Sequence, residues 1–221
     1  MRAEHAARSR IVLLPGALEP AAAFEAAGFR AAVAARDLPL DLEFAELEIR
    51  DVADRSVLER LLAGPLTDAR RAGCRTVWLG GVSFGAFLSV ACADRFRGSV
   101  DGLCLIAPYL GTRLASSAIA RAGGLSKWRP AAGTEHDEDL RAWRFLGRPS
   151  AERCPIFLGY GREDRFADSQ VLLAQALAAD AGDAVAIVEG GHDWTAWRAA
   201  WESFLACWPR LDAGVRVAGS V

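Results

Sequence analysis

Short apolar runs alternate along the chain with longer stretches in which apolar residues recur at helical spacing. The apolar runs predict six strands, at Ile11–Leu14, Asp41–Ile49, Thr76–Leu79, Gly102–Ile106, Pro155–Tyr160 and Ala184–Val188. The stretches between them predict helices over Ala21–Ala35, Arg55–Ala72, Phe84–Arg95, Ala167–Ala179 and Trp194–Trp208. Continuous apolar strands separated by helices are typical of a parallel sheet that is covered on both faces. With right-handed crossovers, this pattern predicts one α/β domain, a doubly wound three-layer sandwich with a mostly parallel sheet of about six strands.

One interval, residues 109–154, departs from this alternation. It contains no clear strand and is much longer than the usual connection of about 2–6 residues. Two short helices are expected inside it, at Ser116–Ala122 and Glu138–Phe145. We interpret the interval as an insertion that forms a small cap over the C-terminal ends of the strands.

The run Gly81-Val82-Ser83-Phe84-Gly85 lies between a predicted strand and a predicted helix. A serine at such a tight turn has a strained backbone, and the glycines two residues away let strand and helix pass close together. The hydroxyl of Ser83 would then stand above the N-terminus of the helix, where the Phe84 N–H can stabilise an oxyanion. Gly-x-Ser-x-Gly is a loose pattern alone, but this context favours Ser83 as a nucleophile.

A serine nucleophile needs a base, and the chain has three histidines. His5 lies in a polar leader and His136 in an acidic segment, so both are expected at the surface. His192 follows the last predicted strand and two glycines, which let its loop bend back over the end of the sheet. We therefore predict His192 as the general base.

The acid that orients this base should come from another strand end. Asp164 follows the strand Pro155–Tyr160 and precedes a helix, and it is our candidate, with Glu163 as the neighbour that could replace it. The side chain of Asp193 is expected to point away from the adjoining histidine. Asp168 is expected to cap the helix that follows.

The chain order Ser83, Asp164, His192 is that of α/β-hydrolases. The chain resembles this superfamily from Ile11 to Trp208, in the segments Leu14–Gly16, Gly81–Gly85, Ala107–Leu110, Gly159–Phe166 and Gly190–Trp194. It is most similar to small bacterial esterases and thioesterases. Two features differ: Pro15 stands where many members have histidine, and the first two strands of the full eight-stranded sheet are missing. The sequence thus predicts a minimal α/β-hydrolase fold.

The loop after the first strand should supply the second oxyanion donor. We expect this donor to be the Ala17 N–H, with Leu18 as the alternative donor and a substrate-binding residue. Substrate contacts are also expected from Tyr109 and Leu110 at a strand end. Two tryptophans of the predicted cap could either roof an acyl chain or pack within the cap, namely Trp128 and Trp143.

Together these residues predict a serine hydrolase that cleaves a small carboxylic ester or thioester through an acyl-enzyme. A non-catalytic ligand-binding protein with this fold is the alternative. A hydroxynitrile lyase would need a lysine near the site, and Lys127 is the single lysine of the chain.

The composition limits the remaining possibilities. The net charge of -2 and pI of 6.0 provide no positive field for nucleic acid or an acidic membrane surface. We expect no cofactor and no metal, because the sequence lacks a phosphate-binding glycine loop and a metal-ligand spacing. Five cysteines without a Cys-x-x-Cys pair predict free thiols. The apolar run near the N-terminus is too short for a signal peptide, so we expect a cytoplasmic protein.

Overall fold

The computed structural model describes residues 8–17, 19–48 and 56–215, and within these ranges it contains a single six-stranded sheet. The strands are β1 (Ser9–Leu14), β2 (Leu40–Phe44), β3 (Val77–Val82), β4 (Gly102–Ile106), β5 (Ile156–Gly161) and β6 (Ala184–Val188). Their order is β2-β1-β3-β4-β5-β6, and every neighbouring pair is parallel. The predicted parallel sheet of about six strands is confirmed.

The strand order reverses direction between β1 and β3. The chain leaves β1 toward β2 on one side and returns to add β3 on the other side. Crevices at such a switch point, beyond the carboxyl ends of the strands, are where open α/β sheets hold ligands. The loop after β1 and the turn after β3 therefore face each other at this crevice.

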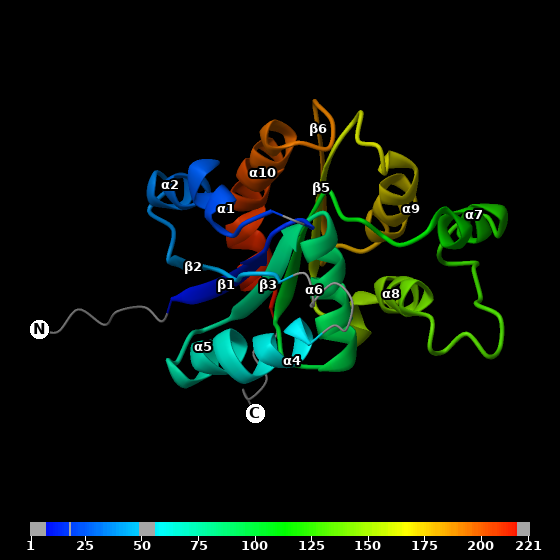
Figure 1. Cartoon of the computed structure of the whole chain (residues 1–221), viewed down its shortest axis with the longest axis horizontal. Coiled ribbons are helices and arrows are strands. Elements are labelled where there is room, and N and C mark those ends of the chain that lie inside the picture. The colour runs from blue at the N-terminus through cyan, green and yellow to red at the C-terminus, as the bar shows by residue number, and fades with distance from the viewer. Residues whose placement is uncertain (1–7, 18, 49–55, 216–221) are drawn as a thin grey trace, which may run out of the picture.

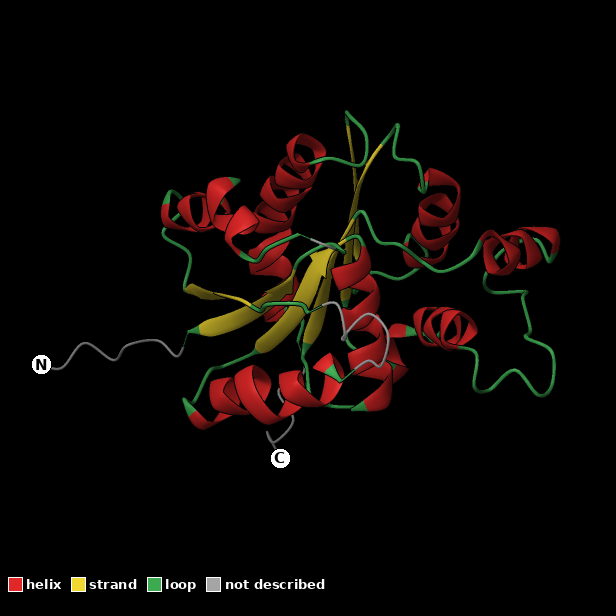
Figure 2. Ribbon diagram, in the orientation of Figure 1, coloured by secondary structure: helices red, strands yellow, loops and turns green. Residues whose placement is uncertain are grey.

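Helices cover both faces of the sheet, so the molecule has three layers (Figures 1 and 2). On one face lie α1 (Ala22–Ala26), α2 (Phe29–Ala34) and α10 (Trp194–Ala213). The other face carries α4 (Val57–Leu61), α5 (Thr67–Arg71), α6 (Phe84–Arg95), α8 (Glu138–Leu146) and α9 (Ala167–Leu177). The short helix α7 (Arg113–Arg121) lies farther from the sheet, beside α9 (Figure 1).

Aromatic residues fill the layer between the sheet and α10. Trp201 stacks on Phe29 of α2 at a ring distance of 5.0 Å. Trp208 contacts Trp78 of β3 edge-to-face at 5.3 Å. These rings have almost no exposed surface, and such burial contributes roughly 1.5–3 kcal/mol per large side chain. The layer therefore anchors α10 firmly against the strands.

Two predicted boundaries near the N-terminus are wrong. The strand β2 stops at Phe44 because its partner β1 ends at Leu14, and the last paired residues are Leu13 and Phe44. Ile49, the end predicted for this strand, lies outside the described residues. The helix predicted over Ala21–Ala35 is two helices, since Gly28 between them has φ of 76° and so cannot continue a right-handed helix.

Two further boundaries also differ. The helix predicted from Arg55, which lies outside the described residues, is interrupted by a π-helical turn, Leu62–Leu66, before α5 begins. Pro65 has no N–H to donate, which disrupts the regular hydrogen-bond ladder there. The strand β3 continues past Leu79 to Val82, because both intervening glycines pair with β1 and β4.

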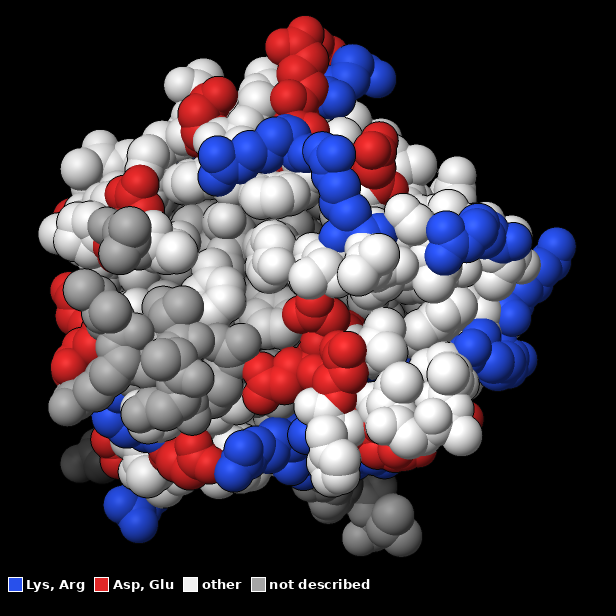
Figure 3. Space-filling model, turned by 45° about the vertical axis from the view of Figure 1, so that its right-hand side comes forward, with Lys and Arg blue, Asp and Glu red and all other residues white. Residues whose placement is uncertain are grey.

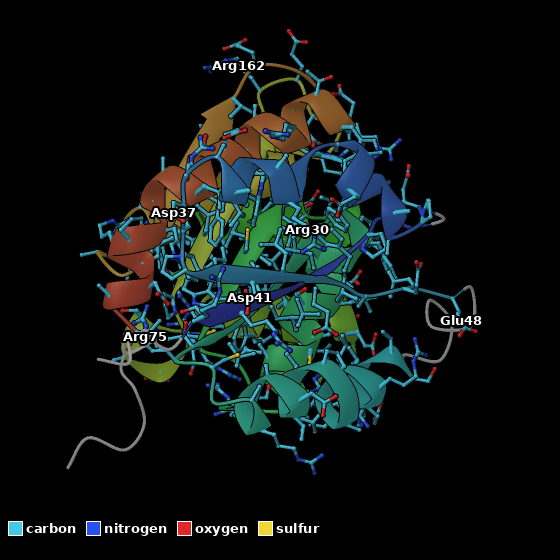
Figure 4. The ribbon with its side chains drawn as sticks, turned by 90° about the vertical axis from the view of Figure 1, so that its left-hand side faces the viewer. Arg30, Asp37, Asp41, Glu48, Arg75 and Arg162 are labelled. Atoms are coloured by element: carbon cyan, nitrogen blue, oxygen red, sulfur yellow. The ribbon has the colours of Figure 1, made fainter. Side chains whose placement is uncertain are left out.

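The edge strand β2 is protected by charged side chains. Asp41 pairs with Arg8 at 2.7 Å, and the guanidinium of Arg30 donates to the carbonyl of Leu42 at 3.1 Å. Figure 4 shows Arg30 and Asp41 on this edge. Charges of this kind discourage pairing with another exposed strand. No helix of the described ranges is both long and apolar enough to cross a bilayer.

Candidate active site

Ser83 occupies a sharp turn between β3 and α6. Its backbone has φ of 51° and ψ of −115°, a conformation that a non-glycine residue rarely adopts. Two hydrogen bonds hold it: the Ser83 N–H donates to Ile106 O at 3.0 Å, and the Tyr109 N–H donates to Ser83 O at 3.1 Å. The end of β4 thus fixes the strained turn that presents the hydroxyl.

The glycines around Ser83 are required by close backbone approach. A Cβ on either Gly81 or Gly85 would overlap the carbonyl oxygen of Leu14. This means that the loop after β1 passes directly against the serine turn. A Cβ on Gly16 would lie 3.7 Å from the Cβ of Ser83.

The side chains of Ser83, His192 and Asp164 form one hydrogen-bonded series. His192 Nε2 lies 2.9 Å from Ser83 Oγ, and His192 Nδ1 lies 2.8 Å from Asp164 Oδ2. The three residues come from the turns after β3, β6 and β5, and they are up to 109 positions apart in the chain. The structure therefore brings together the three residues predicted as nucleophile, base and acid.

Backbone contacts between the loops after β5 and β6 set this geometry. The Glu163 N–H donates to Gly190 O at 3.0 Å, and the Arg162 N–H donates to Val188 O at 2.8 Å. Gly190 has φ of 103°, which only glycine adopts readily, and it turns the chain toward Ser83 just before His192. The two loops thus hold Asp164 and His192 as one unit.

The hydrogen bonds of Asp164 determine the tautomer of His192. The carboxylate of Asp164 is fully buried, and each of its oxygens accepts one bond: Oδ2 from the imidazole and Oδ1 from the Phe166 N–H at 2.8 Å. A carboxylate can only accept, so Nδ1 of His192 carries the proton. Nε2 is then free to accept the proton of Ser83.

Two aromatic rings fix the plane of the imidazole. Phe166 contacts His192 at a ring distance of 5.0 Å and 87°, and Trp197 contacts it at 5.1 Å and 86°. The side chain of His192 is only 7% exposed as a result. These neighbours were missed from the sequence: Trp197 reads as part of the apolar stripe of its helix, and nothing local marks Phe166 as a neighbour of a histidine 26 positions away.

Neighbouring carboxylates take other positions. Glu163 is exposed and is not the partner of His192. Asp193 points away from His192, as predicted, and caps α10 by accepting from the Ala196 N–H at 3.0 Å. The cap predicted for Asp168 is wrong, because Asp168 already lies in the first turn of α9, where Phe166 is the N-cap residue.

The residues predicted for the oxyanion hole lie on the turn of Ser83 and in the loop after β1. Phe84 is the first residue of α6, directly after the serine, and Ala17 is exposed in the turn after β1. Leu18 lies outside the described residues. Tyr109 is half-buried among aromatic side chains, with ring distances of 5.9 Å to Phe87 and 5.5 Å to Phe166.

The other predicted substrate contacts lie in the core. Trp143 has no exposed surface, and its indole N–H donates to Leu110 O at 2.9 Å. Leu110 and Trp128 are 2% and 7% exposed and belong to the same apolar cluster. Of the two roles expected for the tryptophans, the structure favours packing for Trp143, because its helix α8 folds against α6 instead of standing above the site.

The described residues contain no group of three or more His, Cys, Asp or Glu side chains that could hold a metal ion. On the face shown in Figure 3, basic and acidic side chains are interspersed.

Comparison with known proteins identifies the fold. No family model matches the chain, and no curated protein matches it by sequence. Solved structures do match. A ferulic acid esterase superposes with a TM-score of 0.58 at 13% identity, over 95% of this chain and 88% of that protein. An S-formylglutathione hydrolase from Staphylococcus aureus has a TM-score of 0.66 at 12% identity, over 90% and 83%.

A fluorophosphonate-binding serine hydrolase, also from Staphylococcus aureus, has a TM-score of 0.61 at 11% identity, over 92% of this chain and 85% of that protein. Identities this low establish shared architecture and leave substrates open. The chain has the α/β-hydrolase fold.

Proposed function

We propose that this protein is a serine hydrolase that cleaves a small carboxylic ester or thioester. The observation that carries the proposal is the hydrogen-bonded series Asp164–His192–Ser83, with the serine on a strained turn above the N-terminus of α6. A binding pocket alone has no need of all three groups in this geometry. The fold shared with esterases and hydrolases is consistent with it.

The chemistry follows from the protonation states. Nε2 of His192 takes the proton of Ser83 as Oγ attacks the substrate carbonyl. The N–H groups of Phe84 and Ala17 are the proposed donors to the oxyanion, and loss of one such donor typically lowers the rate by about 10²–10³. The buried Asp164 stabilises the imidazolium. His192 protonates the leaving alcohol or thiol, then activates a water that releases the acyl group.

The segment 109–154 is proposed to shape the substrate site. Its helix α8 packs on α6, so we assign the cap role to α7 and the loops beside it. Tyr109, whose N–H donates to Ser83 O at 3.1 Å, is the proposed substrate contact. No cofactor is needed for this reaction, and we place the protein in the cytoplasm, where its five free thiols would remain reduced.

The two alternatives differ in their chemistry. A non-catalytic binding protein would not activate Ser83. A lyase would need Lys127 near the site, but its side chain lies beside Gly123, after α7. No observation favours either alternative.

The experiment is replacement of Ser83 by Ala. Hydrolysis of p-nitrophenyl acetate should fall on the order of 10⁶-fold with the fold intact, since the nucleophile is lost. A fluorophosphonate probe should label the wild type at Ser83 and leave Ser83→Ala unlabelled. Ser203→Ala is the matched control: it alters a half-buried serine of α10 whose hydroxyl donates to Ala199 O at 3.0 Å, and it should keep full activity. Unchanged turnover in Ser83→Ala, or an unlabelled wild type, would contradict the proposal.

A further inference from the structure

A cleft of about 680 Å³ lies at the end of the sheet opposite to Ser83. It is bounded by the residues after α6 and α8, by the starts of β4 and β5, and by the last turn of α10. Figure 4 labels one residue from each end of the sheet: Arg162, beside the loop of Asp164, and Arg75, which precedes β3. The cleft and the triad are therefore separated by roughly the length of a strand, about 20 Å.

Its size fits a small organic molecule. Small-molecule pockets have volumes of roughly 300–1,000 Å³ and combine apolar walls with a few fixed polar groups. The apolar wall here comes from Ala93, Val100, Phe145 and Leu211, all buried side chains of the core. None of these residues takes part in the proposed hydrolysis.

Four arginines line the same cleft, namely Arg97, Arg148, Arg153 and Arg210. The side chain of Arg153 is buried and is neutralised by two hydrogen bonds to the buried carboxylate of Asp183. Arg148 shares the single carboxylate of Asp94 with another arginine, Arg141. Positive charge therefore exceeds negative charge around Arg148.

The other two arginines have no carboxylate within ion-pair distance in the described part of the chain. Arg97 is exposed in the turn that follows α6. Arg210 is held in place by two neutral acceptors, the backbone carbonyls Ala181 O at 3.0 Å and Asp183 O at 3.1 Å. Of the two acidic lining residues, Asp101 is paired with Arg70, and Glu152 lies exposed on the rim.

We infer that this cleft is a second binding site, for a carboxylate that carries an apolar chain. Guanidinium groups bind carboxylates through paired, charge-assisted hydrogen bonds. The apolar wall lies directly beside them: the guanidinium of Arg148 covers the ring of Phe145 at 5.3 Å. A small inorganic anion would leave this wall without a partner, whereas an amphipathic carboxylate contacts both surfaces.

The test is isothermal titration calorimetry with octanoate as the probe, and with 1-octanol and inorganic phosphate as comparison ligands. Octanoate should bind wild type and Ser83→Ala equally well, because the cleft does not include the serine. Arg97→Gln should weaken octanoate about tenfold, as expected for loss of one charge-assisted contact. Glu152→Gln should tighten it. Octanol and phosphate should each bind at least about tenfold more weakly than octanoate.

Two further variants separate cleft occupancy from general effects. Ala151→Trp fills the mouth of the cleft from an exposed position and should abolish binding without unfolding the protein. Arg71→Gln removes an exposed arginine outside the cleft, 77% exposed in its side chain, and should change nothing. Thermal unfolding of each variant checks the fold.

The inference would be overturned by no saturable octanoate binding, by binding unaffected by both Arg97→Gln and Ala151→Trp, or by phosphate binding as tightly as octanoate. Binding that is lost in Ser83→Ala would also overturn it, by placing octanoate at the active site. That last outcome would leave the proposed hydrolase function standing.

Discussion

Replacing Asp164 by Asn should abolish most activity by inverting the tautomer of His192. The two oxygens of this carboxylate accept from two donors, the imidazole Nδ1–H at 2.8 Å and the Phe166 N–H at 2.8 Å. An amide has only one oxygen. The backbone N–H of Phe166 can only donate, so the Asn oxygen must face it, and the Asn NH₂ then faces the imidazole.

Nδ1 of His192 would consequently become an acceptor, and the ring proton would move to Nε2. That nitrogen lies 2.9 Å from Ser83 Oγ and could then no longer take its proton. The wrong tautomer in such a triad lowers kcat by about 10⁴-fold, equivalent to about 5.5 kcal/mol in the activation free energy.

The assay is the kcat for p-nitrophenyl acetate, measured with the thermal unfolding midpoint. Asp164→Asn should lose activity and keep its fold, since the amide fills the same buried volume. Asp168→Asn is the matched control, because this exposed carboxylate of α9 has no contact with His192 and its replacement should leave kcat unchanged. A kcat for Asp164→Asn within tenfold of the wild type would refute the assigned tautomer.

Three other predictions follow from buried groups. Trp143→Phe should lower the free energy of unfolding by about 1–2 kcal/mol, because the hydrogen bond to Leu110 O is lost, and KM should not change. A raised KM at unchanged stability would instead place this ring in the substrate site. Asp212→Ala should lower the free energy of unfolding in urea by roughly 2–4 kcal/mol, because this buried carboxylate accepts from the buried hydroxyl of Thr76 at 2.5 Å and pairs with an arginine. A decrease below about 0.5 kcal/mol would contradict this prediction. Burial raises the pKa of the Cys154 thiol from 9.0 to about 12, so the folded state keeps a proton that the unfolded state releases above pH 9. The free energy of unfolding of the wild type should therefore fall between pH 9 and about 12, and this thiol contributes up to about 1.4 kcal/mol per pH unit. The free energy of unfolding of Cys154→Ala should fall less steeply over the same range. Equal slopes for the two proteins would contradict the prediction.

The catalytic candidates could be predicted because each carries a local signal. Ser83, Asp164 and His192 all follow an apolar strand at a turn that contains or adjoins glycine. In a parallel sheet, all strand ends of one kind lie at the same edge, so chain order alone places the three residues together. Once the three residues lie at this edge, the conformations of their loops decide whether the side chains form hydrogen bonds.

The environment of the site could not be predicted in the same way. Phe166 and Trp197 flank His192, but they lie at the starts of two different helices, α9 and α10. The two rings come together only after these helices have packed on opposite faces of the sheet. The tryptophan of α8 could equally have roofed a substrate or packed inside. Its burial depends on the contact of α8 with α6, which no local pattern records.

By itself, then, the sequence determined the alternation of strands and helices, the parallel sheet and the three side chains that form the hydrogen-bonded series. These depend on residues close together in the chain: hydrophobic periodicity, strand ends and glycine turns. Only the tertiary structure decided the tautomer of His192, the burial of Trp143 and the arginine-lined cleft. These depend on contacts between distant segments, where the same local pattern is compatible with several ways of packing.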